Sequence, residues 1–228
     1  MLKEEEKKPD RWHRHGEAPV PVVSPDKKWE AYVKDNNLYI SPVRDEKEKD
    51  KPKEEIALTM DGTTNLRYDA WSIIWSPDSR KLATVKVRDV QERRIPLIES
   101  SPSSQKQPIL QWRDYAKPGD VLPVYLPVLF DVEARRQVAL DVAPYENQYY
   151  LNLTGWRKDS RAFTFEFNQR GHQRYVIGEV NAADGSIRHL VDEQTKTFIY
   201  YYNNFRYDLM MEKNCFGFPN GTDGVIFT

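Results

Sequence analysis

Residues 71–87 read WSIIWSPDSRKLATVKV, and this stretch decides the fold because two related copies of it occur elsewhere in the chain. Residues 22–33 read VVSPDKKWEAYV, and residues 155–167 read GWRKDSRAFTFEF. Each copy has apolar residues, then a polar turn that contains Asp, then a segment in which apolar and polar residues alternate. Because alternation with a period of two is typical of strands, each copy predicts a strand, a tight turn and a second strand.

The turn of the middle copy is Ser76-Pro77-Asp78-Ser79. Proline favours the backbone conformation of the second turn position, and Asp and Ser side chains in such turns bond to nearby backbone amides. We therefore expect Asp78 and Ser79 to form hydrogen bonds within their own turn. The flanking strands are predicted at Trp71–Trp75 and Lys81–Val87.

A second predicted hairpin follows each copy, at residues 37–62, 128–142 and 175–193. The strongest turn signal among them is Asp184-Gly185, a pair that favours two-residue hairpin turns. Two hairpins make a four-stranded antiparallel unit, and recurrence of such a unit is typical of β-propeller blades. The sequence therefore predicts an all-β fold, a partial β-propeller of about three to four blades of four-stranded antiparallel sheet.

The turn aspartates at positions 26, 78 and 159 lie 52 and 81 residues apart, so the second blade carries an insertion. The insertion, residues 88–123, is rich in proline and charge and does not resemble a blade strand. Long insertions between strands often form binding surfaces, but a solvated loop fits this composition equally well. The charged run at 44–55 predicts an exposed hairpin tip.

The 228 residues are enough to bury a core, and their net charge is only -1. This balance gives no electrostatic reason to expect nucleic acid or an anionic membrane as a partner. No apolar run approaches the roughly 20 residues of a membrane span. The first residues contain no apolar stretch, so no signal peptide is predicted, and Cys215 is the only cysteine.

Several motifs together resemble a known family. They are WSPDSRKLATVKV at 75–87, RRIPLIESSP at 93–102, AKPGDVLPVYLPVLFDV at 116–132 and the segment from FEFNQRGH to HLVDE at 165–193. This set resembles the amino-terminal propeller of dipeptidyl peptidase IV-like serine peptidases, bacterial members of the prolyl oligopeptidase clan. The resemblance covers about residues 18–209, and the insertion is its most specific part.

The resemblance implies a role in proteolysis. In that family the propeller caps a carboxy-terminal α/β-hydrolase domain, whose Ser-Asp-His triad cleaves peptides, often after a penultimate proline. It implies a peptide substrate for the intact relative and a periplasmic or secreted location. The Gly-x-Ser-x-Gly motif of a nucleophile elbow does not occur here, so the hydrolase domain is missing and we expect no catalysis. A stand-alone interaction scaffold and a non-functional gene fragment remain alternatives.

The family also holds the free amino end of its substrate with paired glutamates just ahead of a WSP-type strand. The corresponding stretch here, DGTTNLRYDAWSIIWSP at 61–77, has no adjacent glutamates. The pair Glu54-Glu55 lies in the charged hairpin, where a solvated role fits better. The sequence thus assigns no substrate-binding residue and puts strict dipeptidyl specificity in doubt.

None of the four histidines lies in a catalytic motif. His172 is expected in a turn, and His189 is expected on a strand with partial exposure. His13 and His15 could share a metal, but two ligands make a weak site. We predict no catalytic, metal or cofactor site, and no cofactor.

The sequence predicts three segments: a frayed amino end at 1–17, the partial propeller at 18–209, and an aberrant tail at 210–228. A fourth blade is expected to begin at Thr197–Leu209. Codons that encode the tail can be read in a shifted frame that begins at the last base of the Leu209 codon. One permitted translation in that frame is NDGKKLFWISERDGWGHLY, which contains a turn, a strand and a second Asp-Gly turn. We therefore predict that a one-base frameshift produced the tail, against the alternative of a genuinely divergent sequence.

Overall fold

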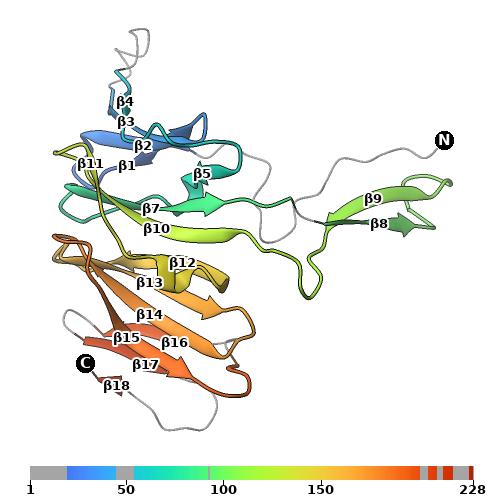
Figure 1. Ribbon diagram of the computed structural model, residues 1–228. Coiled ribbons are helices and arrows are strands. Elements are labelled where there is room, and N and C mark those ends of the chain that lie inside the picture. The colour runs from blue at the N-terminus through green and yellow to red at the C-terminus, as the bar shows by residue number, and fades with distance from the viewer. Residues whose placement is uncertain are drawn as a thin grey trace. The chain divides into compact units, whose positions relative to one another are not determined.

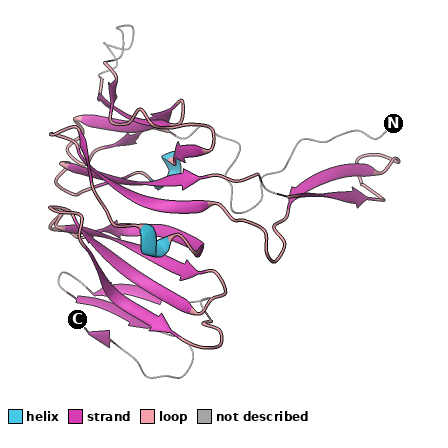
Figure 2. Ribbon diagram, in the orientation of Figure 1, coloured by secondary structure: helices cyan, strands magenta, loops and turns pink. Residues whose placement is uncertain are grey.

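The computed structural model describes residues 20–44, 54–91 and 93–200, and the backbone of three strands beyond them (Figure 1). The regular secondary structure of the described residues is antiparallel sheet, apart from two short 3₁₀ helices (Figure 2). It divides into two units, which are treated separately below. One contains Asp89–Pro123, and the other contains Pro21–Arg88 and the chain from Val124 onward.

The first sheet has the strand order β1-β2-β3-β4, with every pair antiparallel. Its strands are β1 (Val22–Val23), β2 (Trp29–Lys34), β3 (Asn37–Pro42) and β4 (Ile56–Ala57). Asp35 and Asn36 form the turn between β2 and β3, and both have positive φ. A two-residue turn with positive φ at both positions has a twist that matches the twist of the antiparallel strands on either side. Most of the charged run, residues 45–53, lies outside the described residues.

The second sheet has the order β11-β10-β7-β5, and β6 also pairs with β7. Its strands are β5 (Leu66–Tyr68), β6 (Ile74–Trp75), β7 (Lys81–Arg88), β10 (Val124–Asp131) and β11 (Arg136–Val138). The 3₁₀ helix η2 (Ala70–Ser72) separates β5 from β6. The prediction of one strand over Trp71–Trp75 is therefore wrong, since only its last two residues are paired.

The third sheet contains the longest strands and runs in the order β12-β13-β14-β15. Its strands are β12 (Gln148–Trp156), β13 (Ala162–Gln169), β14 (Arg174–Asn181) and β15 (Ile187–Gln194). A second 3₁₀ helix, η3 (Ala143–Tyr145), precedes β12. The predicted Asp184-Gly185 turn joins β14 to β15, and Gly185 has a φ of 76° that favours glycine. We call each of these three sheets a blade.

Three further strands are described by their backbone alone. They are β16 (Phe205–Leu209), β17 (Lys213–Gly217) and β18 (Ile226–Phe227), which pair antiparallel in that order. The strand expected at the end of Thr197–Leu209 is thus present. Most of the tail at 210–228 and all of the amino end at 1–17 lie outside the described residues, so the frameshift stays a prediction.

The second blade is buried on both faces because it contributes to two apolar cores. Side chains alternate along β7, so Leu82 joins the core shared with the first blade and Ala83 joins the core shared with the third. On β10, Phe130 joins the core shared with the first blade and Leu129 joins the core shared with the third. Four successive residues of β7 are buried because the strand lies between two blades. In a strand that is solvated on one face, buried and exposed side chains would alternate.

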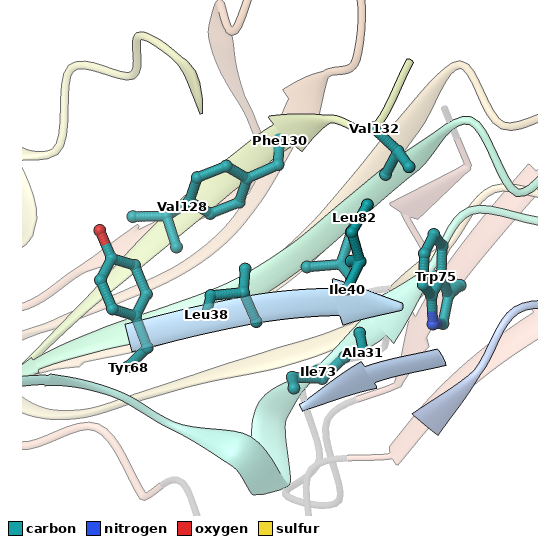
Figure 3. Packing of buried hydrophobic residues seen from close by; sticks show 10 residues of the cluster. All are labelled: Ala31, Leu38, Ile40, Tyr68, Ile73, Trp75, Leu82, Val128, Phe130 and Val132. Atoms are coloured by element: carbon teal, nitrogen blue, oxygen red, sulfur yellow. The ribbon is translucent and has the colours of Figure 1, made fainter. Parts of the chain in front are cut away.

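The core between the first two blades is formed by side chains that point toward one another from β2, β3, β7 and β10 (Figure 3). Its buried members are Ala31, Leu38, Ile40, Tyr68, Ile73, Trp75, Leu82, Val128, Phe130 and Val132. The core between the second and third blades is rich in aromatic residues, with Phe163, Phe165 and Phe167 on one face of β13. Stacking of blades through apolar faces confirms the predicted partial propeller.

The repeated turns have one local arrangement. The Ser76 hydroxyl donates to Asp78 Oδ1 at 2.6 Å, and the same oxygen accepts the Arg80 N–H at 3.1 Å. The next turn position is left-handed in each copy, with φ near 60° at Lys27, Ser79 and Ser160. Local bonding by Asp78 is therefore confirmed.

The Ser79 backbone N–H donates to the carbonyl of Ser76 at 2.9 Å, but the Ser79 side chain does not bond within its own turn, so the prediction is wrong for the hydroxyl. Its Oγ accepts the backbone N–H of Asp26 at 3.0 Å, across the junction between the first and second blades. One junction later, Ser160 Oγ accepts the backbone N–H of Asp78, again at 3.0 Å. The left-handed conformation gives the physical reason, because it turns the serine side chain away from its own turn.

A tryptophan makes a second bond across each junction. The Trp75 indole N–H donates to the carbonyl of Val22 at 2.8 Å, and the Trp156 indole N–H donates to the carbonyl of Ile74 at 3.2 Å. The second and third blades therefore each contact the preceding blade through a tryptophan indole and a serine hydroxyl at equivalent positions.

The unit that contains the insertion forms a hairpin, not the open loop that its composition allowed. Strands β8 (Arg94–Glu99) and β9 (Ile109–Asp114) pair antiparallel along their full length. At its base, Arg93 forms a bidentate pair with Asp120, with both N–O distances 2.9 Å. The hydrogen bond from Arg93 holds the pKa of Asp120 well below its usual range, although the site is exposed.

Candidate functional site

The interruption between β5 and β6 is the most distinctive surface feature of the second blade. Trp71, on η2, has half of its surface exposed. The neighbours Tyr68, Ile73 and Trp75 are buried in the core between the first two blades. The chain thus presents one large aromatic side chain to solvent from a segment that is otherwise anchored in the core.

Two hydroxyls hold this interruption in place. Thr84 Oγ1 donates to the carbonyl of Asp69 at 2.8 Å, and Ser72 Oγ accepts the N–H of Val85 at 3.0 Å. The two hydroxyls are also 2.9 Å apart, and Thr84 is fully buried. The N–H of Asp69 still donates to the carbonyl of Val85 at 2.9 Å. Side chains therefore replace the missing strand hydrogen bonds, which keeps η2 in a defined conformation.

The acidic residues near this interruption are paired with cations. Asp61 accepts a hydrogen bond from the Tyr68 hydroxyl at 3.0 Å and forms an ion pair with Lys86. Burial acts to raise the pKa of Asp61, but the hydrogen bonds from Lys86 and Tyr68 outweigh it and hold that pKa below its usual value. Asp69 lies 3.8 Å from Arg67. Within residues 61–77, no two acidic residues are adjacent in the sequence.

Polar contacts join the second and third blades near the end of β7 and the starts of β10 and β12. Arg88, at the end of β7, pairs with Glu146 at 3.2 Å in an exposed position. Beside it, the buried side chain of Gln148 bonds to both backbone groups of Tyr125, at 2.9 and 3.0 Å, and to the carbonyl of Tyr145 at 2.8 Å. These polar contacts fix the start of β12 against β10.

His189 lies on β15, as predicted, with 31% of its side chain exposed. Its Nδ1 is 2.9 Å from Asp192 Oδ2, and its Nε2 is 2.8 Å from the Tyr145 hydroxyl. The hydrogen bond from Arg174 lowers the pKa of Asp192 to about 2. The Tyr145 ring is almost completely buried and packs edge-on against Phe165. This Asp-His-Tyr chain therefore has its hydroxyl in the core, where it supports the fold and cannot reach a substrate.

His172 lies in the turn after β13, which confirms its predicted place. It has a positive φ of 57°, and its ring packs edge-on against Tyr149 and at a tilt against Phe198, with centroid distances of 4.5 and 5.0 Å. Its Nδ1 is 3.1 Å from Asn168 Oδ1, and burial lowers its pKa. His172 is thus a packing residue of the third blade.

The remaining residues considered from sequence do not form a site. Glu55 accepts bonds from the Tyr32 hydroxyl at 2.9 Å and from Lys34 Nζ at 2.6 Å, in the exposed hairpin where a solvated role is expected. His13 and His15 lie outside the described residues. Within the described ranges, no group of three or more potential ligands could hold a metal ion. In the same part of the chain, no helix is long and apolar enough to cross a bilayer.

Sequence reasoning missed Trp71 as a functional candidate. The pattern places it on a strand as an apolar position, whereas the structure places it on η2 with half of its surface exposed. The signal that could have identified it is the pair Ser72 and Thr84, because two hydroxyls at apolar strand positions favour bonds to backbone groups.

Comparison with solved structures supports the fold. The chain is similar to dipeptidyl peptidase 4 of Porphyromonas gingivalis, with a TM-score of 0.61 and 16% identity over 86% of this chain and 29% of that one. It is also similar to a putative dipeptidyl aminopeptidase IV of Bacteroides ovatus, with a TM-score of 0.53 and 16% identity over 78% of this chain and 24% of that one. The chain therefore spans less than a third of these proteins.

No curated protein matches the chain in the sequence comparison. The family model described as the dipeptidyl peptidase IV (DPP IV) N-terminal region matches residues 2–224, nearly the whole chain. That range includes all three described blades and the hairpin of β8 and β9. The chain belongs to the dipeptidyl peptidase IV N-terminal region family.

Proposed function

We propose that this chain is the non-catalytic propeller portion of a dipeptidyl peptidase IV-like serine peptidase, in which it admits peptide substrates and contacts them. A carboxy-terminal α/β-hydrolase domain of the intact protein performs the hydrolysis. The observation that carries this proposal is the family match over residues 2–224, together with blades that pack in the manner of a propeller. The peptide is the substrate, and no cofactor is required.

The described surface suits a neutral peptide better than a free amino group. An ammonium ion would be held most strongly by two unpaired carboxylates, because it carries several donors and a compact charge. Here the acidic groups Asp61, Asp69 and Glu146 each already have a cationic neighbour. We therefore propose that this propeller contacts peptides through backbone and apolar groups more than through their amino end.

The proposal is tested by titrating the purified chain with the peptide Gly-Pro-Phe-Gly and following its backbone amide resonances by NMR. Saturable shifts confined to a set of neighbouring residues are expected, with weaker or no shifts for Gly-Ser-Ser-Gly. Amide shifts that are absent up to millimolar peptide would contradict a substrate-contacting role.

A catalytic assay on the same sample gives an independent control. Because the chain has no Gly-x-Ser-x-Gly motif, no release of nitroaniline from a glycyl-prolyl nitroanilide is expected. Turnover that co-purifies with the chain and survives a second purification step would show that the chemistry resides here.

A further inference from the structure

Both ring nitrogens of His189 have a polar partner, and the two partners fix where the ring carries its hydrogen. Nδ1 lies 2.9 Å from the carboxylate of Asp192, and Nε2 lies 2.8 Å from the hydroxyl of Tyr145. Because an ionised carboxylate can only accept hydrogen bonds, Nδ1 carries the hydrogen in the neutral ring. Nε2 is then an acceptor, and the Tyr145 hydroxyl donates to it.

The carboxylate of Asp192 stays ionised over the pH range in which histidines titrate. Arg174 donates two hydrogen bonds to it, at 2.9 and 2.7 Å, and these bonds lower its pKa to about 2. The His189 side chain is 31% exposed, so water can deliver a proton to the ring. A change in this network between pH 8 and pH 5 therefore reflects the charge of His189.

The Tyr145 hydroxyl has His189 as its only hydrogen-bond partner in the part of the chain that the structure describes. The residue is 2% exposed, and its ring packs edge-on against Phe165 and Phe167, with centroid distances of 4.9 and 5.4 Å. This packing holds the oxygen in place, so that only the hydroxyl hydrogen can turn. Burial raises the pKa of Tyr145, so the hydroxyl keeps its hydrogen throughout this pH range.

The charged groups near the Tyr145 hydroxyl give it no other acceptor. On β15, the guanidinium of Arg188 bonds to Glu179 and not to His189. Neither aspartate near the hydroxyl forms a hydrogen bond with it. The charged groups that face it are Arg174, Asp192 and Asp141, which precedes η3.

Protonation of His189 places a hydrogen on Nε2, directly opposite the Tyr145 oxygen. The oxygen can accept a hydrogen bond from Nε2, but the hydroxyl then has no group to which it can donate. A buried donor without an acceptor is unfavourable, whereas the neutral ring satisfies both groups. The pair of Tyr145 and His189 therefore holds together best when the ring is neutral.

We propose that His189 is a pH-sensitive switch on the connection between the second and third blades: protonation of Nε2 ends the hydrogen bond that Tyr145 donates and loosens η3. This helix follows β11 of the second blade and precedes β12 of the third, and the bond ties it to β15. The next residue, Glu146, pairs with Arg88 at the end of β7, so a looser η3 also affects the second blade.

The test compares the full chain with Tyr145→Phe, which keeps the packed ring and removes the hydroxyl. At pH 8, Tyr145→Phe should raise the equilibrium constant for unfolding in urea about fivefold, because one hydrogen bond is lost. At pH 5 the difference should vanish or reverse, since the parent chain then carries a hydroxyl without an acceptor. The matched control is the background His189→Gln, which does not titrate; there Tyr145→Phe should have the same effect at both pH values.

A second measurement needs no folded Tyr145 variant. In the full chain with ¹⁵N-labelled histidine, the ring nitrogen shifts of His189, assigned with His189→Gln, should show hydrogen on Nδ1 alone at pH 8 and on both nitrogens at pH 5. Backbone amides of residues 143–148 should shift between these pH values in the parent chain and not in His189→Gln. An effect of Tyr145→Phe that is equal at both pH values, a neutral ring with its hydrogen on Nε2, or unmoved amides at 143–148 would overturn the switch.

Discussion

The hydrogen bond between Ser160 Oγ and the Asp78 N–H should contribute measurably to stability, because it joins two blades. Substitution Ser160→Ala removes an acceptor at 3.0 Å and leaves a partly buried donor without its partner. One such bond contributes about 0.5–1.5 kcal/mol, and an unsatisfied buried donor costs about 1–3 kcal/mol. Since this site is only partly buried, we expect a loss of about 1–2 kcal/mol, or a melting temperature lower by about 2–8 °C.

The backbone conformation at Ser160 allows a second comparison. With a φ of 62°, residue 160 lies in the left-handed region, where glycine has an advantage of about 1–2 kcal/mol over other residues. Ser160→Gly loses the same hydrogen bond but relieves this conformational cost. It should therefore be about 1 kcal/mol more stable than Ser160→Ala.

Urea unfolding followed by far-UV circular dichroism measures these differences through the transition midpoint. The matched control is Ser186→Ala, because Ser186 donates only to Asp184 within its own exposed turn, at 2.7 Å. That substitution should change stability by no more than about 0.5 kcal/mol. Equal midpoints for Ser160→Ala and Ser186→Ala would refute the view that the hydroxyl at 160 joins the blades.

Two further predictions concern the third blade. In Gly178→Ala, the added Cβ would lie 2.3 Å from the Phe165 ring, so we expect the free energy of unfolding in urea to fall by about 2 kcal/mol or more. The additional substitution Phe165→Leu should recover part of this stability. An unchanged midpoint for Gly178→Ala would contradict this packing. Arg174 lowers the pKa of Asp192 to about 2, so this carboxylate stabilises the fold above about pH 4 and loses that effect as the pH falls toward 2. Because the pair is partly exposed, Asp192→Asn should be less stable by about 1 kcal/mol at pH 6, and the gap to the parent chain should close by pH 2 in unfolding titrations. A gap that is independent of pH would show that Arg174 does not act through the charge of Asp192.

The blade architecture could be predicted from sequence because period-two alternation and turn residues are local signals. The hairpins around Asp78 and Asp184 follow from such signals, and the structure confirms them. The role of Ser79 could not be predicted, since its partner Asp26 lies 53 residues away and nothing local identifies a bond between blades. The hydrogen-bond partner of such a polar turn residue is set by a tertiary contact with a residue that is distant in the sequence.

The candidate site was harder to predict for a similar reason. Trp71 matches an apolar strand position, and only the contacts of Ser72 and Thr84 with the backbone reveal that the strand is interrupted there. The hairpin of β8 and β9 was ambiguous because proline and charged residues suit both exposed strands and loops. The absence of an adjacent glutamate pair, by contrast, could be read directly from the residue types.

The bonds that tryptophan and serine make between blades run in one direction along the chain. In these bonds the later blade brings an indole and a hydroxyl, and the earlier blade offers only backbone groups, which any sequence can supply. A gene segment that encodes one blade with its Trp and Ser can therefore be duplicated after another blade without a matching change in that neighbour. The long insertion after β7 leaves these bonds intact, because it enters at the opposite end of the strand from the turn that makes them. A propeller built in this way can gain blades and loops independently, so that new binding surfaces arise without changes in the hydrogen bonds that join the blades.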